Sequence, residues 1–375
     1  MSTRNRWALV FAASVLAASG QVVGFSSARP PAWKINFPPD SPVVLVSAEW
    51  NDSRTEPRGG ALVLDIDSVL SLKNASQRRI RGLTLLVLSQ EVTAGGKASV
   101  SAQSLDIRPG ETFPMHIQLR LLRPLLPSAG PLAQVSLDGV LFDDLTFYGP
   151  NQLNSRRAMT VWEMEARRDR QYFKSVLAAK GPDGLKREMQ QTLARLADSP
   201  HFEVQVARAR RTTAVAEEKP LQFAFLEIPD SPIEPVSGVA NIAGNEARAP
   251  QVSVRNRSRR TVSYFEIGWI IKDQQGRQFL AGSVHAPEAG MRLAPGASTQ
   301  VSENAQLQFS SEPGRPVAIT GMTGFVSQVE FSDGAIWIPN RSAIQDLVPS
   351  PEEQRLADLY RKKGLAALLN ELNRF

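Results

Sequence analysis

The chain has 375 residues, of which 42% are hydrophobic and 21% charged, and it contains no cysteine. This composition is typical of a globular protein and excludes a disulfide-stabilised scaffold and a low-complexity disordered chain. The formal net charge is +6, which is a mild excess. No aromatic-plus-basic pattern of a nucleic-acid module accompanies the arginines, so we expect no nucleic-acid partner.

The N-terminus has the pattern of a secretory signal. Arg4 and Arg6 precede the apolar run Trp7–Leu16, and the small residues Ala17–Gly20 follow it. The pattern predicts a signal peptide over residues 1–28, cleaved after Gly20 or Ala28. The alternative is a retained anchor, the only membrane contact we expect, because residues 7–25 approach the length of a membrane span. The predicted location is the periplasm or the exterior of a bacterium, or the membrane through this segment.

The sequence repeats itself in four blocks. The first match joins Glu49, Asp52, Ser53, Glu56, Pro57 and Gly60 to Glu227, Asp230, Ser231, Glu234, Pro235 and Gly238. The second and third join Leu70–Ser76 to Val252–Ser258 and Leu105–Gly110 to Met291–Gly296. The fourth joins Val140, Phe142, Asp144, Pro150 and Asn151 to Val329, Phe331, Asp333, Pro339 and Asn340. The offset drifts from 178 to 182, 186 and 189 residues, which predicts a duplicated domain with short loop insertions.

Alternating hydrophobic patterns predict a mainly β fold. Residues 113–121 alternate apolar and polar side chains, the period of a strand with one buried face. Seven or eight such strands per repeat predict two tandem immunoglobulin-like β-sandwich domains, at residues 41–152 and 220–345. Trp269 lies centrally in a predicted strand, so we expect it in a core. Asp273–Gly276 predicts a hairpin turn, and Asp333-Gly334 predicts another.

Helical segments are expected after each repeat. Apolar residues at helical spacing predict two helices over residues 153–198, joined by a turn at Gly181–Gly184. A second segment covers residues 350–375, where Ser350 is the expected N-cap, Glu353 completes a capping box, and Gly364 allows a bend. Residues 199–219 are the expected linker, although the alternation of residues 202–206 could add a strand.

The arginine-rich runs of the helical and linker segments have two interpretations. They are Arg156-Arg157, Arg167–Arg170 and Arg208–Arg211. A solvated helix face is favoured over contact with lipid headgroups, glycans or nucleic acid, because acidic residues interrupt the first two runs.

Candidate chemistry is sparse. His116, His201 and His285 are each alone in their local segment, and no nucleophile elbow or phosphate-binding loop occurs. The repeated acids Glu49, Asp52 and Glu56, with Glu227, Asp230 and Glu234, could gather calcium, but turn chemistry is favoured. Trp337 could form a partly exposed platform for a sugar or peptide. We predict no catalytic residue, metal site or cofactor.

Four Asn-x-Ser triplets begin at Asn51, Asn74, Asn256 and Asn340. They could accept glycans in a eukaryotic secretory pathway, but a structural role in turns is favoured.

The sequence therefore predicts an exported, noncatalytic bacterial protein that binds, adheres or acts as a scaffold in the cell envelope, with an envelope protein or glycan as partner. The alternatives are a hydrolase of envelope polymers that uses carboxylates, and an assembly factor that captures a strand at a sheet edge. The ligand and oligomeric state are left open.

Overall fold

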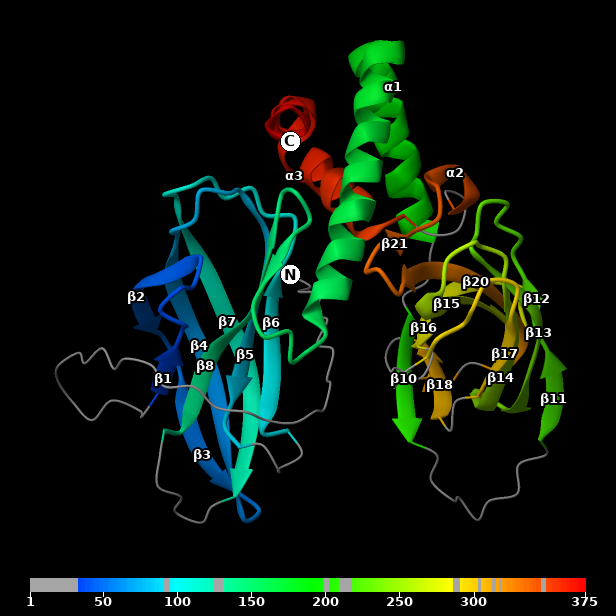
Figure 1. Cartoon of the computed structure of the whole chain (residues 1–375), viewed down its shortest axis with the longest axis horizontal. Coiled ribbons are helices and arrows are strands. Elements are labelled where there is room, and N and C mark those ends of the chain that lie inside the picture. The colour runs from blue at the N-terminus through cyan, green and yellow to red at the C-terminus, as the bar shows by residue number, and fades with distance from the viewer. Residues whose placement is uncertain are drawn as a thin grey trace. The chain divides into compact units, whose positions relative to one another are not determined.

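The computed structural model describes residues 33–90, 95–124, 131–198, 202–208, 218–285, 291–302, 305–311, 315–316, 318–344 and 349–375. The predicted signal peptide lies outside these residues. The described chain is mainly β, with several sheets and three helices, and it divides into two compact units at residue 163 (Figure 1).

Two sheets form the β part of unit 1. One has the order β1-β8-β5-β6, with β9 beside β8; the strands are β1 (Trp33–Asn36), β5 (Ile80–Leu88), β6 (Lys97–Ala102), β8 (Ala133–Phe142) and β9 (Phe147–Tyr148). In the other, β4 pairs with β7 on one side and with β2 and β3 on the other; the strands are β2 (Val43–Trp50), β3 (Arg54–Arg58), β4 (Ala61–Asn74) and β7 (Thr112–Pro124).

Unit 2 also contains two sheets. One has the order β12-β20-β15-β16, with β21 beside β20; the strands are β12 (Ala224–Phe225), β15 (Val262–Asp273), β16 (Gln278–His285), β20 (Ile319–Phe331) and β21 (Ile336–Trp337). The other has the order β10-β18-β14-β13-β11; its strands, with β17 and β19, are β10 (Phe202–Arg208), β11 (Lys219–Gln222), β13 (Ile233–Ala243), β14 (Glu246–Asn256), β17 (Ser298–Ser302), β18 (Ala305–Ser311) and β19 (Arg315–Pro316). Residues 202–206 therefore do form a strand.

In each unit the two sheets share one hydrophobic core. The alternation predicted for residues 113–121 is confirmed, because β7 buries Phe113, Met115 and Ile117 and exposes the residues between them. In unit 2 Trp269 is fully buried, and the ring of Phe223 lies edge-on to it at 4.7 Å. The prediction that Trp269 is a core residue is thus confirmed.

The order of strand pairings in unit 1 occurs again in unit 2. A short strand pairs parallel to a long one, β1 with β8 and β12 with β20. That long strand then pairs antiparallel with the first strand of a hairpin, β5 in unit 1 and β15 in unit 2. The hairpin partners are β6 and β16. In the other sheets, β2-β4-β7 corresponds to β13-β14-β17.

The structure corrects the first of the four repeat blocks. Ser41 Oγ donates to the carbonyl of Val43 at 2.7 Å, and Ser231 Oγ donates to that of Ile233 at 2.6 Å. Val43 then pairs with Asn74, as Ile233 pairs with Asn256. Asp40-Ser41-Pro42 is therefore the counterpart of Asp230-Ser231-Pro232, and the match of Glu49 and Asp52 to Glu227 and Asp230 is wrong. The similar order of acids and turn residues in two non-equivalent segments caused the error.

Both repeats bury an asparagine in the same turn. The side-chain nitrogen of Asn74 donates to the carbonyls of Arg78 and Ile107 at 2.8 and 3.2 Å. That of Asn256 donates to the carbonyls of Arg260 and Leu293, both at 2.8 Å. Both asparagines are fully buried, so the turn interpretation is confirmed for these two triplets against glycan attachment. Asn51 and Asn340 are exposed.

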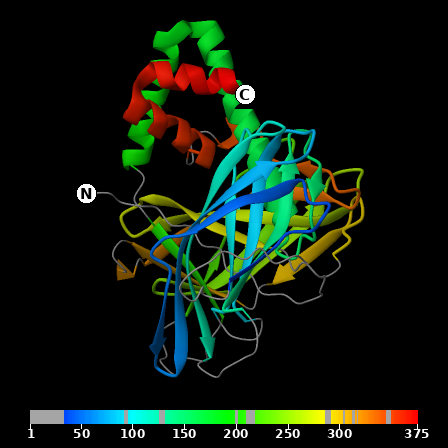
Figure 2. The ribbon, with the colours of Figure 1, turned by 90° about the vertical axis from the view of Figure 1, so that its left-hand side faces the viewer.

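Three helices complete the described chain: α1 (Ser155–Asp198), α2 (Arg341–Ile344) and α3 (Pro351–Arg374). Both long helices break at a glycine with positive φ, Gly181 in α1 and Gly364 in α3, so each forms two segments (Figure 2). The predicted turn at Gly181 and bend at Gly364 are confirmed. No helix among the described residues is long and apolar enough to cross a membrane.

We predict that Asn256→Ala destabilises unit 2 by about 2–4 kcal/mol, because the carbonyls of Arg260 and Leu293 lose their buried donor. Asn74→Ala should destabilise unit 1 by a similar amount. Urea unfolding followed by hydrogen exchange in each unit measures both changes. Asn340→Ala, which alters an exposed triplet, is the control, and equal effects of all three substitutions would contradict the assigned role.

Candidate functional site

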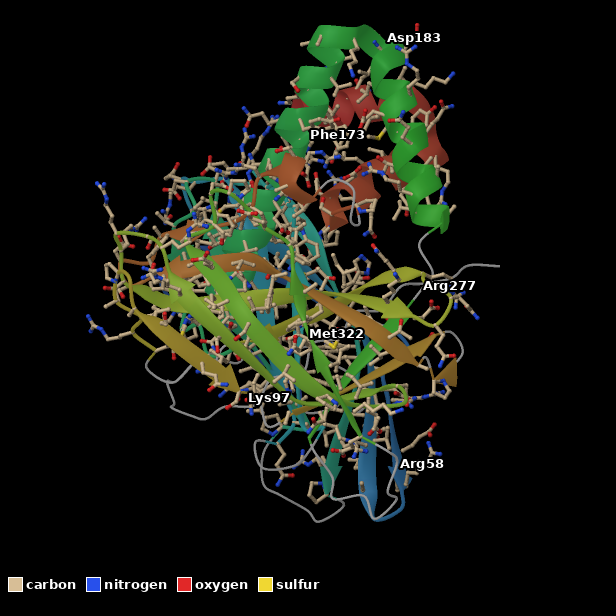
Figure 3. The ribbon with its side chains drawn as sticks, turned by 90° about the vertical axis from the view of Figure 1, so that its right-hand side faces the viewer. Arg58, Lys97, Phe173, Asp183, Arg277 and Met322 are labelled. Carbon is tan, nitrogen blue, oxygen red and sulfur yellow. The ribbon has the colours of Figure 1, made fainter. Side chains whose placement is uncertain are left out.

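A group of linked charges lies in the helical part of unit 2, and its acids are buried. We call it the ionic cluster; its members are Arg168, Asp169, Arg170, Arg195, Arg341, Glu352, Glu353 and Arg355. It joins both segments of α1 to α2 and to the start of α3. Figure 3 shows these helices with their side chains, with Phe173 among them and Asp183 at the turn of α1.

Arg341 lies at the centre of the ionic cluster. Its Nη1 is 3.1 Å from Oδ1 of Asp169 and 2.7 Å from Oε2 of Glu353. Its guanidinium also lies over the ring of Tyr172, 4.2 Å from the centroid. Burial lowers the pKa of Arg341, but the pairs with Glu353 and Asp169 outweigh burial and hold that pKa above its ordinary value.

A second buried contact in the ionic cluster fixes Glu352. Arg170 Nη1 donates to Oε1 of Glu352 at 3.1 Å, and Arg355 Nε donates to Oε2 at 2.8 Å. The guanidinium of Arg170 lies over the ring of Phe375 at 4.0 Å, which places the last residue of the chain against α1. Glu352 thus links α1 to α3.

Local sequence explains why the acids of α3 enter the ionic cluster. Ser350 caps α3 as predicted, because its Oγ accepts from the backbone N–H of Glu353 at 3.1 Å. The second half of the predicted capping box is absent. The Glu353 carboxylate accepts instead from Arg195 at 2.7 Å and from Thr192 at 2.6 Å. The Glu353 carboxylate therefore bonds to the second segment of α1 rather than to the backbone of Ser350.

Apolar side chains surround the ionic cluster. Phe173, Leu185 and Met189 of α1 are fully buried, and they form one core with four residues of α3, namely Leu356, Ala357, Leu368 and Leu372. The interpretation of Arg167–Arg170 as a solvated helix face is wrong for Arg170, which is only 4% exposed. Sequence reasoning missed this cluster because Arg341 is 172 residues from Asp169, and no local pattern joins them.

The pKa of the Glu165 carboxyl in α1 is clearly shifted. Burial raises the pKa of Glu165 to about 7; Arg168 lowers it, whereas the negative charges of Asp169 and Glu266 add to the rise. Glu266 lies on β15, where it accepts from the hydroxyl of Tyr264 at 3.2 Å. The pKa of Glu165 therefore lies close to neutral pH.

Unit 1 has smaller buried polar groups. Asp106 accepts from Arg79 at 3.0 Å and from Arg81 at 2.9 Å. Asp138 accepts from Ser155 Oγ at 2.5 Å, and burial raises the pKa of Asp138 although this bond opposes the rise. Ser155 begins α1, so Asp138 of β8 bonds to the helix start.

Most buried carboxylates of the described residues have structural partners. Eight of them have a specific donor or cationic partner: Asp106, Asp138, Glu163, Asp169, Glu266, Asp273, Glu352 and Glu353. General acid or base work needs a carboxyl that can reach a substrate. Carboxylates held by arginines instead fix the relative positions of helices and strands.

The sequence-predicted site residues are not brought together. Glu49, Asp52 and Glu56 are exposed, as are Glu227 and Asp230, and no group of three potential metal-binding side chains occurs in the described part of the chain. His116 is exposed on β7; His201 lies outside the described residues, as does the side chain of His285.

The remaining candidates have structural surroundings. Trp337, on β21, packs partly buried against the core of unit 2. The predicted turn at Asp333-Gly334 is confirmed, because the N–H of Gly334 donates to the carbonyl of Phe331 at 2.8 Å. The carboxylate of Asp333 pairs with Arg260. The turn at Asp273–Gly276 is also confirmed, with the N–H of Gly276 donating to the carbonyl of Asp273 at 3.1 Å.

No family model and no curated protein matches the chain. Among solved structures, the putative ApaA protein from Bordetella pertussis is similar at 15% identity over 38% of this chain and 91% of that one, with a TM-score of 0.18. The structural-genomics target SoR45 is similar at 12% identity over 38% and 81%, also with a TM-score of 0.18. These TM-scores are too low to support an argument about fold or function.

We predict that Arg341→Met destabilises unit 2 by about 3–5 kcal/mol, because Asp169 and Glu353 lose the cation buried between them. The midpoint of urea unfolding measures the effect. Arg361→Met is the matched control, since Arg361 pairs with Asp358 on the exposed surface of α3 and should matter by less than about 1 kcal/mol. A midpoint of Arg341→Met equal to that of the control would contradict a structural role for the ionic cluster.

We also predict a pH dependence that comes from Glu165. Its folded pKa of about 7 lies above the ordinary 4.5, so the folded state retains a proton that the unfolded state has lost. This contribution to stability is complete at low pH and is lost as the pH rises from about 4.5 to 7. Glu165→Gln should remove that loss in unfolding measured across this range, whereas Glu227→Gln at an exposed site should not. An unchanged profile in Glu165→Gln would contradict the assignment.

Proposed function

We propose that this chain is an exported, noncatalytic bacterial protein that acts as a binding or scaffold module in the cell envelope. It consists of two tandem immunoglobulin-like β-sandwich domains, at residues 41–152 and 220–345, with helical segments at 153–198 and 350–375. An envelope protein or a glycan is its expected partner.

The repeated strand pairing supports the immunoglobulin-like assignment. In each unit two sheets share one core, and the strands of each sheet are mostly joined by antiparallel pairs. Seven to nine strands in two facing sheets are typical of such a sandwich. The equivalent turns at Asn74 and Asn256 support a duplication as the origin of the two units.

The assignment of the buried carboxylates to structural partners is the observation that carries the noncatalytic proposal. A hydrolase that acts through carboxylates needs two of them facing a substrate across a cleft. The ionic cluster instead surrounds its acids with arginines, and Asp106 of unit 1 likewise accepts from two arginines. Such groups support a rigid scaffold that presents its surface to a partner.

The proposal is tested by incubating the purified chain with envelope polymers, including peptidoglycan, and following product release. We expect no turnover above that of a heat-denatured sample. Turnover that is lost in Asp138→Asn or Glu165→Gln would contradict the proposal, provided that circular dichroism shows both variants folded. Export is tested separately by fusing residues 1–40 to a reporter that is active only outside the cytoplasm.

One edge strand favours strand capture as a second candidate function. β7 pairs with β4 on one side, and the N–H of Leu122 points away from β4 because it donates to the carbonyl of Gly95 at 2.8 Å. In a regular strand the N–H groups of His116, Gln118 and Arg120 point the same way. In unit 2 the place of β7 is taken by β17 and β18, which both pair with β14, and β10 covers β18 (Figure 1).

Equivalent β-bulges interrupt β2 and β13. The pairing of β2 with β4 skips Val46, and that of β13 with β14 skips Val236, so both valines are extra residues in a β-bulge. They occupy equivalent positions and are the most exposed large apolar side chains described, at 55% and 61%. Bulges interrupt the hydrogen-bonding ladder that an added strand would need. Strand addition is therefore disfavoured at β2 and at this part of β13, whereas the pairing of β7 with β4 has no such bulge.

A peptide with the sequence of β10, Phe202–Arg208, is the probe for this second candidate. We predict that the full chain binds it and that Gln118→Pro weakens binding at least about tenfold, because proline removes an outward N–H without touching the pairing with β4. Fluorescence titration measures the affinity, with Gln118→Ala as the control. Equal affinities of the two variants would exclude capture at β7.

A further inference from the structure

The turn around Asn256 differs from its counterpart around Asn74 in charge but not in backbone structure. Each asparagine accepts from the serine two residues later, Ser76 at 3.0 Å and Ser258 at 2.9 Å from the backbone N–H. Gly110 donates to the carbonyl of Asn74 at 2.8 Å, as Gly296 does to that of Asn256 at 2.9 Å. The two turns therefore keep the same backbone hydrogen bonds although their side chains differ.

In unit 1 a buried acid pairs with two arginines at this end of the domain. Asp106 is 3.0 Å from Arg79 and 2.9 Å from Arg81. The equivalent position in unit 2 is Arg292, since Ile107 and Leu293 make the same contacts to the preceding asparagines. The position that holds the buried Asp106 in the first repeat thus holds the exposed Arg292 in the second.

Two further positions gain a positive charge. Ala75 and Gln77 of the first turn correspond to Arg257 and Arg259 of the second, and Lys73 corresponds to Arg255. We call Arg255, Arg257, Arg259 and Arg292 the arginine patch; all four are exposed. Among the described residues none of the four has an ion-pair partner, whereas the neighbouring Arg260 pairs with Asp333. The second repeat therefore gathers four arginines without an ion pair among the described residues, with Glu234 opposite Arg255 in the pairing of β13 and β14.

We propose that the arginine patch binds the phosphate groups of an anionic membrane surface. A guanidinium donates two parallel hydrogen bonds to a phosphate, which suits arginine to this ligand. The four side chains come from the end of β14, the turn after it and the segment before β17. This arrangement spreads the charge over a surface rather than around one point, as recognition of many adjacent headgroups requires.

The surroundings favour a lipid surface over a single-stranded nucleic acid. Single-stranded nucleic acids are usually held by bases stacked on exposed aromatic rings. The large apolar side chains that the described residues expose are Val44, Val46, Leu122 and Val236, and none is aromatic. The inference goes beyond the proposed scaffold role, since it holds whether or not the chain also captures a protein.

The experiment measures co-sedimentation of the full chain with vesicles of phosphatidylcholine alone and of phosphatidylcholine with 30 mol% phosphatidylglycerol, about the anionic content that gives a substantial surface potential. In the ratio of the two partition coefficients, the contribution of contacts that do not depend on lipid charge cancels. We expect a ratio well above one that falls as salt is added. Replacing the four patch arginines with glutamine should lower the ratio at least about tenfold.

A control variant removes the same net charge elsewhere. It carries Arg58→Gln, Lys73→Gln, Arg108→Gln and Lys363→Gln, four exposed positions outside the patch. We expect the ratio of this variant to change by less than about twofold, with circular dichroism showing both variants folded. Equal losses in the two variants would overturn the proposal, because net charge alone would then explain binding.

Soluble polyphosphate provides the remaining arm of the test. Binding of polyphosphate that depends on the patch, without vesicle binding, would also overturn the proposal, because the surface would then recognise a free phosphate polymer. Vesicle binding lost only in the patch variant would establish it. Turnover of an envelope polymer would contradict the noncatalytic proposal but would not change the vesicle result. The two proposals can therefore fail independently.

Discussion

Arg341 is buried between Asp169 and Glu353, and the helical part of unit 2 depends on this contact. It joins α1 to the chain that follows the second β domain and to the start of α3. Taking these charges out of water costs several kcal/mol per ion, which only close pairing can offset. Phe173 of the helical core packs against these ions, since the guanidinium of Arg341 lies 5.1 Å from the centroid of its ring.

The two β parts use a different device, the buried asparagine turn. Its side chain supplies hydrogen bonds that an adjacent strand would otherwise supply, so the turn has the same form in both repeats. Because this frame is fixed, exposed positions around it can change without loss of structure. One such position holds Asp106 in the first repeat, where it forms a buried ionic group. The same position holds Arg292 in the second repeat, where it is part of a basic surface.

Local patterns in the sequence predicted much of the fold. The alternation of residues 113–121, the cap at Ser350 and the breaks at Gly181 and Gly364 depend on near neighbours, and the structure contains all of them. The first repeat block was misaligned because turns reuse the same few residue types. Val46 and Val236 went unnoticed, since a bulge is defined by strand pairing rather than by sequence.

The candidate sites could not be predicted in the same way. Asp169, Arg341 and Glu353 are far apart in the sequence, and each alone resembles a surface residue of a helix. Arg170 was taken for a solvated residue for that reason, although Glu352 pairs with it in the interior. The arginine patch likewise has meaning only after Asp106 and Arg292 are known to be equivalent.

The most direct test of this account is the coupling free energy between Arg341 and Asp169, measured by a double-mutant cycle with Arg341→Met and Asp169→Asn. If the buried charges exist to hold the helices together, the coupling should be about 2 kcal/mol or more. A coupling near zero would show that the two side chains stabilise the unit independently, and it would contradict the structural role on which the noncatalytic assignment rests.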